Sequence, residues 1–157
     1  MSSVDLDHYK DVVSHYATGV VVITAMTPDG PVGFSCQTFG SLSLDPVLIS
    51  FAAKSAGQSW PRIRSVGIVG ISMLSADQED LARRFARSGV DKFAGVAWAQ
   101  APHGSPLLEG SLAHLEGRIL SVTTYGDHDI AVVAVDYVQA NAASPLLYYR
   151  GGYGLPA

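Results

Sequence analysis

Short runs of β-branched and aromatic residues, each closed by a turn signal, constrain the fold of this 157-residue chain more than any other feature. Val, Ile, Thr and aromatic residues favour strands, and segments such as Pro28-Asp29-Gly30 are typical of the turns that join them. The strand candidates are residues 20–26, 32–40, 47–53, 68–74, 112–124, 130–140 and 145–149. Six or seven strands without a repeating strand–helix–strand pattern predict a mainly β chain that forms an antiparallel barrel.

Three segments carry helical signals instead. Residues 7–16 place apolar side chains at helical spacing, and we expect this helix to lie against the barrel or against a partner. Ser59 can cap a short helix that ends near residue 66, and Ser75 with Gln78 has the spacing of a capping box for a helix that stops near Gly89. Residues 91–110 lack any sustained periodicity, so they are expected to form a long ordered connection.

Length and composition limit the class of protein. The chain fits a single domain over residues 1–157, and 48% hydrophobic content supplies ample material for a core. A formal net charge of −4 argues against binding to nucleic acid or to an anionic membrane. Cys36 is the single cysteine, the first residues lack the pattern of a signal peptide, and no segment has the length of a membrane span, so a cytoplasmic location is expected.

The stretch from Val32 to Pro46 is the strongest candidate for a binding site. It offers hydroxyl and amide groups between aromatic and aliphatic residues, and it carries no charge before Asp45. Neutral donors and acceptors beside apolar walls suit a flat ligand that is rich in heteroatoms. A half-buried strand with a polar outer face explains the same alternation without any ligand.

Several motifs together give the chain a resemblance to a known family. In order along the chain they are YATGVVVIT, GFSCQTFGSLSLDP, AKSAGQSWPRI, DQEDLARRFA, DKFAGVAW, GSPLLEGSLAHLEG, GDHDI and PLLYYRGGY. The chain resembles the short-chain flavin reductases, which have the FMN-binding split-barrel fold and reduce free flavin for a separate monooxygenase. Ser35-Cys36-Gln37 stands where many relatives have Thr-Ala-Asn, and Gly40 stands where many have Thr.

The resemblance implies a set of flavin-binding residues. Backbone amides of residues 35–38 would meet the pyrimidine edge of the flavin ring, while Lys54 and Ser55 with the amides of residues 56 and 57 would hold the phosphate. The full set of expected contacts is Ser35, Cys36, Gln37, Thr38, Ser41, Lys54, Ser55, Lys92, Phe93 and Tyr153. Without the resemblance, Ser41 would be interpreted as a strand-end cap, and both lysines as solvated surface charges.

His128, in the GDH segment, is the residue that we expect closest to the chemistry. The resemblance implies NADH or NADPH as hydride donor and FMN or FAD as acceptor, and an imidazole in this turn can position the nicotinamide. The alternative is an exposed histidine in a hairpin turn without any role. Cys36 has no basic neighbour in sequence and is interpreted as a packed thiol, and no group of His, Cys and carboxylate residues has metal-site spacing, so no metal is predicted.

The leading hypothesis is therefore an NAD(P)H-dependent flavin reductase that supplies reduced flavin to a partner monooxygenase. A flavin-binding carrier or sensor without turnover is the alternative, and a relative of the pyridoxamine-phosphate oxidases would need a more basic phosphate site. A homodimer is expected, because a barrel of this size leaves an open flank and aromatic residues cluster near the C-terminal end of the chain. In the family that the chain resembles, two subunits wall the flavin site together.

Overall fold

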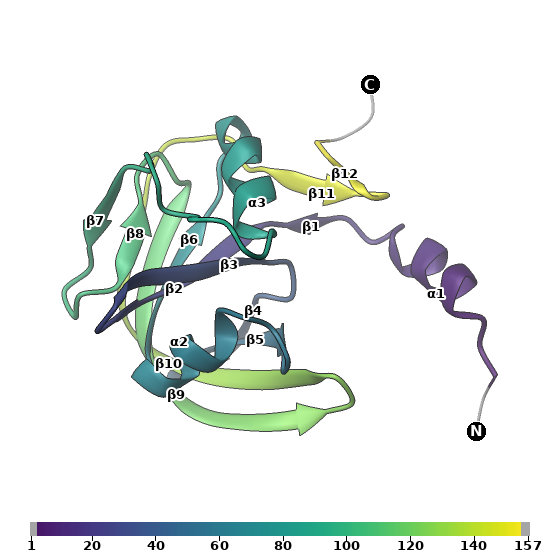
Figure 1. Cartoon of the computed structure of the whole chain (residues 1–157), viewed down its shortest axis with the longest axis horizontal. Coiled ribbons are helices and arrows are strands. Elements are labelled where there is room, and N and C mark those ends of the chain that lie inside the picture. The colour runs from purple at the N-terminus through teal and green to yellow at the C-terminus, as the bar shows by residue number, and fades with distance from the viewer. Residues whose placement is uncertain (1–2, 155–157) are drawn as a thin grey trace.

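The fold is built on one seven-stranded antiparallel sheet, and a computed structural model describes it for residues 3–154. The strand order is β3-β2-β6-β9-β10-β5-β4, with every pair antiparallel. The strands are β2 (Val21–Thr27), β3 (Gly30–Cys36), β4 (Gly40–Leu44), β5 (Val47–Lys54), β6 (Ile68–Met73), β9 (Ala113–Tyr125) and β10 (His128–Ala140). The predicted mainly β, antiparallel architecture is confirmed (Figure 1).

The sheet curls toward a barrel but remains split between β3 and β4, which are its two edges. The strand expected over residues 32–40 breaks after Cys36, and the hydroxyl of Thr38 bridges the opening to β5. The Thr38 hydroxyl donates to the carbonyl of Ala52 at 2.9 Å and accepts from the amide of Ala52 at 2.8 Å. One side chain thus replaces the ladder bonds that a closed barrel would have here.

Smaller elements complete the structure. A two-stranded hairpin of β7 (Trp98–Gln100) and β8 (Pro106–Leu108) lies within residues 91–110, so the expectation of a connection without strands was wrong there. Three short strands form a separate sheet, in the order β1-β11-β12. These are β1 (Thr18–Gly19), β11 (Leu147–Tyr149) and β12 (Gly152–Tyr153).

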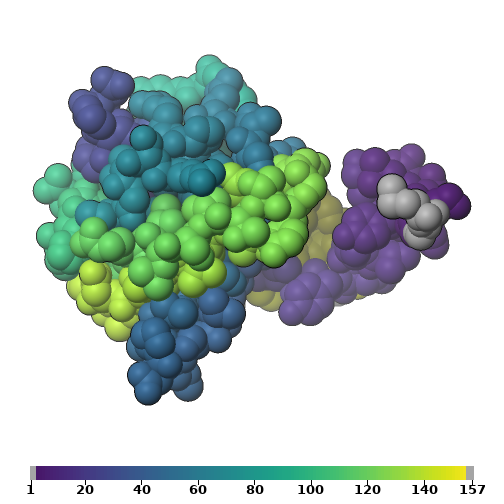
Figure 2. Space-filling view, turned by 90° about the horizontal axis from the view of Figure 1, so that it is seen from below, coloured from purple at the N-terminus to yellow at the C-terminus, as the bar shows by residue number. Residues whose placement is uncertain are grey.

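The helices match the three predicted segments. They are α1 (Leu6–Val13), α2 (Trp60–Val66) and α3 (Glu79–Phe85), and a 3-10 turn, η1 (Ala76–Gln78), precedes α3. The amide of Ser75 donates to Gln78 Oε1 at 2.9 Å, as the capping box predicts. Helix α1 buries no residue against the barrel and stands away from the sheet, so the first of its two expected positions is wrong and a position against a partner stays a prediction (Figures 1 and 2).

Strand β2 is buried on both faces, which explains why its sequence, VVITAMT, is mostly apolar instead of alternating with polar residues. Val21, Ile23 and Ala25 belong to the core enclosed by the curled sheet. Val22, which lies between them, and Val20, just before the strand, belong to a second core, which includes Phe85 of α3 and Leu108 of β8. Since both faces of the strand are covered, no polar face is needed.

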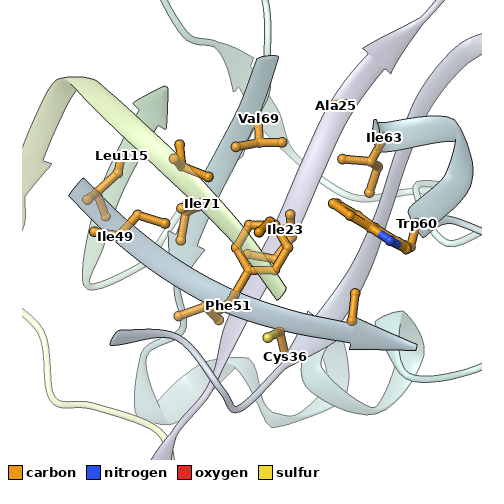
Figure 3. Packing of buried hydrophobic residues seen from close by; sticks show 14 of the residues in the cluster. Ile23, Ala25, Cys36, Ile49, Phe51, Trp60, Ile63, Val69, Ile71 and Leu115 are labelled. Carbon is orange, nitrogen blue, oxygen red and sulfur yellow. The ribbon is translucent and has the colours of Figure 1, made fainter. Parts of the chain in front are cut away.

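Aromatic residues fill the end of the first core nearest α2. Trp60 and Phe51 are 2% and 1% exposed, and their ring centroids are 5.5 Å apart in an edge-to-face arrangement. Figure 3 shows these two rings near Ile63 and Ile23, with the sulfur of Cys36 close to Phe51. The packing fixes α2 on the sheet and leaves the Trp60 side chain at the wall of an adjoining cleft.

Candidate functional site

A cleft of ≈ 350 Å³ lies where the split in the sheet meets the loops that flank α2 and α3. It is lined by Phe34, Ser35, Cys36, Gln37, Thr38, Ala52, Ala53, Lys54, Gly57, Gln58, Ser59, Trp60, Phe85, Ala86, Arg87, Ser88, Lys92 and His128. Seven of the expected site residues thus line one cleft: Ser35, Cys36, Gln37, Thr38, Lys54, Lys92 and His128. They come from distant parts of the sequence: the end of β3 with the residues after it, the end of β5, the segment between α3 and β7, and the start of β10.

The neutral side of the cleft is held in place by internal hydrogen bonds. The hydroxyl of Ser35 donates to the carbonyl of Ala82 in α3 at 2.7 Å, and the Thr38 hydroxyl is committed to Ala52. The Cys36 sulfur lies 3.1 Å from the Thr38 hydroxyl, and burial raises the pKa of the Cys36 thiol. The thiol is therefore neutral at ordinary pH, which agrees with its interpretation as a packed group.

Lys92 is the most constrained cation of the cleft. Its Nζ donates to the carbonyl of Gly33 at 3.0 Å, the carbonyl of Phe85 at 3.2 Å and the hydroxyl of Ser59 at 3.3 Å. Burial lowers the pKa of Lys92 from its usual value. The ammonium therefore joins β3, α3 and the start of α2, and Ser59 accepts from Lys92 while making no side-chain cap on the helix.

The approach of α3 to β3 depends on a glycine. A Cβ at Gly33 would lie 3.0 Å from the carbonyl oxygen of Ile23 and 3.1 Å from the ring of Phe85. Both distances are shorter than ordinary contacts with a Cβ, and the first involves backbone that has little freedom to move. Gly33 thus allows the end of α3 to lie close enough for Lys92 to reach both elements.

Lys54, at the end of β5, is exposed, whereas polar groups of the following loop are already used in hydrogen bonds within the protein. The amide of Gly57 donates to the carbonyl of Lys54 at 3.2 Å, and the amide of Ser55 donates to the carbonyl of Asp127 at 3.1 Å. The Ser55 hydroxyl donates to Asp129 Oδ1 at 2.8 Å. Lys54 remains exposed, and its Cα pairs with that of His128 across β5 and β10.

Asp129 is the buried anchor below this loop. Its carboxylate accepts hydrogen bonds from Trp60 Nε1 at 2.8 Å, from the Thr124 hydroxyl at 2.7 Å and from Ser55, with Arg64 3.6 Å away. The bonds from Trp60, Thr124 and Ser55 lower the pKa of Asp129 to about 2. The residue is 4% exposed and ties the loop, α2 and β9 to the strand that carries His128.

His128 begins β10 and does not belong to the turn itself, which consists of Gly126 and Asp127. Its Nδ1 lies 2.7 Å from Asp127 Oδ1, and the hydrogen bond with His128 lowers the pKa of Asp127. If the Asp127 carboxylate accepts from Nδ1–H, the neutral imidazole has Nε2 as its free acceptor. The ring lines the cleft on the side of Lys54.

The electrostatic character of the cleft differs from that of the whole chain. Within residues 3–154, no Asp or Glu lines it, whereas Lys54, Lys92 and Arg87 do. Since Lys92 is held by three internal acceptors, Lys54 and Arg87 are the cations available to a ligand. Arg87 was not among the predicted residues, although the adjacent Ser88 and Gly89 gave the loop a polar, flexible composition.

Four expected contacts lie away from the residues that line the cleft. Ser41 is exposed on the edge strand β4, and the Ser55 hydroxyl donates to Asp129 instead of lining the cleft. Phe93 packs in the second core, 5.0 Å from the ring centroid of Phe85, and Tyr153 stacks beneath Arg83. Sequence reasoning also missed Trp60 and Asp129, whose relation to the cleft arises only from folding.

Comparisons with known proteins identify the family. The model of the flavin reductase like domain matches residues 13–155. The chain is 39% identical over 155 residues to the reductase subunit HsaB of a flavin-dependent monooxygenase from Mycobacterium tuberculosis, covering 97% of this chain and 83% of that protein. It is 38% identical over 155 residues to a flavin reductase from Pseudomonas putida, covering 98% and 91% of the two chains.

Solved structures agree with this relationship. The fold matches nitrilotriacetate monooxygenase component B from Mycobacterium thermoresistibile with a TM-score of 0.90 and 35% identity, over 96% of this chain and 90% of the other. It matches the NADH:FAD oxidoreductase SgcE6 from Streptomyces globisporus with a TM-score of 0.91 and 30% identity, over 100% and 96%. The chain belongs to the flavin reductase like domain family.

Proposed function

We propose that this protein is an NAD(P)H-dependent flavin reductase, which transfers hydride from NADH to FMN or FAD. The observation that carries the proposal is a cleft with apolar walls, neutral hydrogen-bonding groups and free cations, in a chain whose net charge is −4. None of the described residues that line this cleft is a carboxylate. Such a site suits a ligand with an apolar ring system at one end and a phosphate at the other. SgcE6, a structural relative, is an NADH:FAD oxidoreductase that was solved with NAD and FAD fragments.

The residues of the cleft have separable tasks in this proposal. Phe34 and Trp60 exclude water from the flavin ring, and Lys54 and Arg87 attract the phosphate. When bound, the flavin supplies the hydride acceptor, and transfer needs the nicotinamide held at roughly 3 to 3.5 Å from it. His128, oriented by Asp127, positions the nicotinamide. The hydride transfer itself needs no acid or base, so His128 has no proton-transfer role in it.

Reduced flavin is the product that a second enzyme consumes. The names of HsaB and of the trigonelline monooxygenase component from Acinetobacter baylyi describe them as reductase parts of flavin-dependent monooxygenases. We infer that this chain serves a separate monooxygenase in the same way. In the described part of the chain, no helix is long and apolar enough to cross a membrane. The lone buried thiol fits a reducing compartment such as the cytoplasm.

We also propose that the protein is a homodimer. Helix α1 has no buried residue, and its apolar side chains are strongly exposed, with Tyr9 at 52%, Val12 at 53% and Tyr16 at 80%. Leu44, at the end of β4, is 85% exposed. Apolar surfaces of this kind, on elements that project from the body (Figure 2), are typical of an interface between subunits.

Anaerobic reduction of flavin tests the proposed activity. Equilibrium dialysis with FMN and with FAD is expected to show reversible binding, and NADH is expected to reduce one flavin per molecule oxidised. Binding of flavin without oxidation of either NADH or NADPH would support the carrier or sensor instead. Failure to bind either flavin at concentrations far above ordinary cofactor affinities would contradict the proposal as a whole.

A further inference from the structure

A second polar cluster lies away from the cleft, around a carboxylate that has no lysine or arginine partner among the described residues. Glu116 of β9 is 0% exposed, and its two oxygens accept from the amides of His103 at 2.8 Å and Ser105 at 3.0 Å. Among residues 3–154, no Lys or Arg nitrogen lies within 4.0 Å of it. Burying an ionised carboxylate is costly, so a nearby positive charge would stabilise Glu116.

A β-bulge brings a second carboxylate to the same place. Tyr137 of β10 pairs with Glu116 and Val135 pairs with Gly117, so Asp136 between them has no partner in the ladder. An extra residue of this kind redirects its side chain relative to a regular strand. The Asp136 carboxylate consequently lies within 4.8 Å of a Glu116 oxygen.

The third member of the cluster is an imidazole. His103 lies in the turn between β7 and β8, and its Nε2 is 3.3 Å from Asp136 Oδ2. Two ligands of a tetrahedral ion with bonds of ~2.0 to 2.1 Å are themselves roughly 3.3 to 3.4 Å apart. The ligand atoms of all three residues lie within 4.8 Å of one another, so a small rotation of the two exposed side chains brings them into a coordination shell.

We propose that His103, Glu116 and Asp136 form a binding site for a divalent transition metal of the Zn²⁺ class. One imidazole nitrogen and two carboxylate oxygens suit Zn²⁺, whereas Mg²⁺ and Ca²⁺ prefer oxygen ligands alone. Each carboxylate oxygen of Glu116 has a lone pair left after accepting its amide hydrogen bond. Water completes the shell from the exposed side, where His103 and Asp136 are 47% and 46% exposed.

The site has a structural task and no direct part in flavin reduction. It would fasten the turn between β7 and β8 to β9 and β10, and in Figure 1 this turn lies on the opposite side of the molecule from the turn between β9 and β10. His128 and Lys54 lie near that second turn. Metal binding is therefore expected to raise the unfolding temperature while leaving flavin affinity unchanged, which separates this inference from the proposed function.

Zinc titration of the chelator-treated protein tests the inference. Calorimetry is expected to show one Zn²⁺ per chain, and an excess of about a hundred times the dissociation constant raises the unfolding temperature by roughly 5 °C or more. Co²⁺ in the same site is expected to give the visible absorption of a low-coordinate ion with nitrogen and oxygen ligands.

Variants of the exposed ligands decide whether the cluster is the site. His103→Ala and Asp136→Asn are each expected to weaken Zn²⁺ binding at least ten-fold while leaving the circular dichroism spectrum unchanged. His8→Ala, on exposed helix α1, is the matched control and retains full affinity. If wild type binds Zn²⁺ only at millimolar concentrations, or if the two variants bind as wild type does, the cluster is an ion pair around a buried carboxylate and the inference is wrong.

Discussion

At the scale of single residues, the cleft divides its cations into one that supports the fold and two that are free for a ligand. Lys92 satisfies two backbone carbonyls and a hydroxyl, whereas Lys54 and Arg87 have no comparable bonds among the described hydrogen bonds. Lys92, which the resemblance placed among the flavin contacts, lines the cleft but spends its hydrogen bonds on the protein. Its position depends on three acceptors that no sequence motif encodes.

Removal of the free cations is expected to act on the phosphate alone. Lys54→Ala and Arg87→Ala should each weaken FMN binding by about ten-fold, because a charge-assisted contact to the phosphate is lost. Riboflavin, which has no phosphate, should bind both variants as it binds wild type. Fluorescence titration measures both ligands, and Arg118→Ala, at an exposed position of β9, is the matched control. Equal weakening of FMN and riboflavin would place the phosphate elsewhere.

His128→Ala is expected to separate flavin binding from flavin reduction. The loss of a positioning hydrogen bond of ~0.5 to 1.5 kcal/mol, or more with a charged group, corresponds to about a three-fold to thirty-fold slower reduction by NADH. Flavin affinity should stay nearly unchanged, since the ring is held by the neutral side of the cleft. Anaerobic stopped-flow reduction and a flavin titration on one preparation measure both quantities. An unchanged reduction rate would leave His128 without a role.

At the scale of elements, Asp129 holds together the parts that form the floor of the cleft. Its carboxylate joins the β5–α2 loop through Ser55, helix α2 through Trp60 and strand β9 through Thr124. The end of β5, which bears Lys54, and the strand bearing His128 consequently keep a fixed relation to each other. Flavin affinity should therefore depend on a residue that does not line the cleft.

The pH dependence of stability should reveal this anchor. The pKa of Asp129 is about 2 in the folded protein, below the ~3.9 of an unfolded chain, so its stabilising contribution is complete above about pH 4. It is lost as the pH falls from about 4 toward 2. Urea unfolding at a series of pH values should show Asp129→Asn to be less stable than wild type at pH 7, with a difference that narrows over this range.

The control for this measurement is Asp29→Asn, in the exposed turn between β2 and β3. Its stability should follow that of wild type at every pH. If the difference between wild type and Asp129→Asn were constant down to pH 2, the stabilising bonds of the residue would not depend on its charge.

At the scale of the whole molecule, helix α1 and Leu44 at the end of β4 present apolar side chains to solvent. Helix α1 is joined to the body chiefly through Arg150, which lies 3.2 Å from Asp11 and whose amide donates to the carbonyl of Ser14 at 3.0 Å. The apolar side chains of α1 are exposed to solvent. A second subunit would cover this surface and bury side chains that a monomer leaves in water.

Substitution of the apolar side of α1 tests the dimer. Wild type is expected to sediment with twice the chain mass of 16.5 kDa, and Tyr9→Ser combined with Val13→Ser should shift it toward monomer. Asp7→Ser combined with Lys10→Ser changes the polar side of the same helix and should leave the dimer intact. A wild type that sediments as a monomer at micromolar concentrations would contradict the proposal.

The family resemblance pointed to Ser35, Thr38, Lys54 and His128, which line the cleft. The sequence by itself determined the strand pattern and the capping box at Ser75. These are local signals, because side-chain alternation, turn residues and caps depend on neighbours within a few positions. The β7–β8 hairpin was not predicted, because its strands are short and lack a clear alternation of polar and apolar residues. Local patterns could not give the partners of Lys92, the anchor at Asp129 or the cluster around Glu116.

Only the tertiary structure decided those contacts, for a common physical reason. Each joins residues far apart in the chain, and each satisfies a group that would be costly to bury alone: the ammonium of Lys92, the carboxylate of Asp129 and the carboxylate of Glu116. Which donor reaches which acceptor depends on the curl of the sheet, the glycine at position 33 and the bulge at Asp136. Sequence supplies the groups, and the packing of distant strands selects their partners.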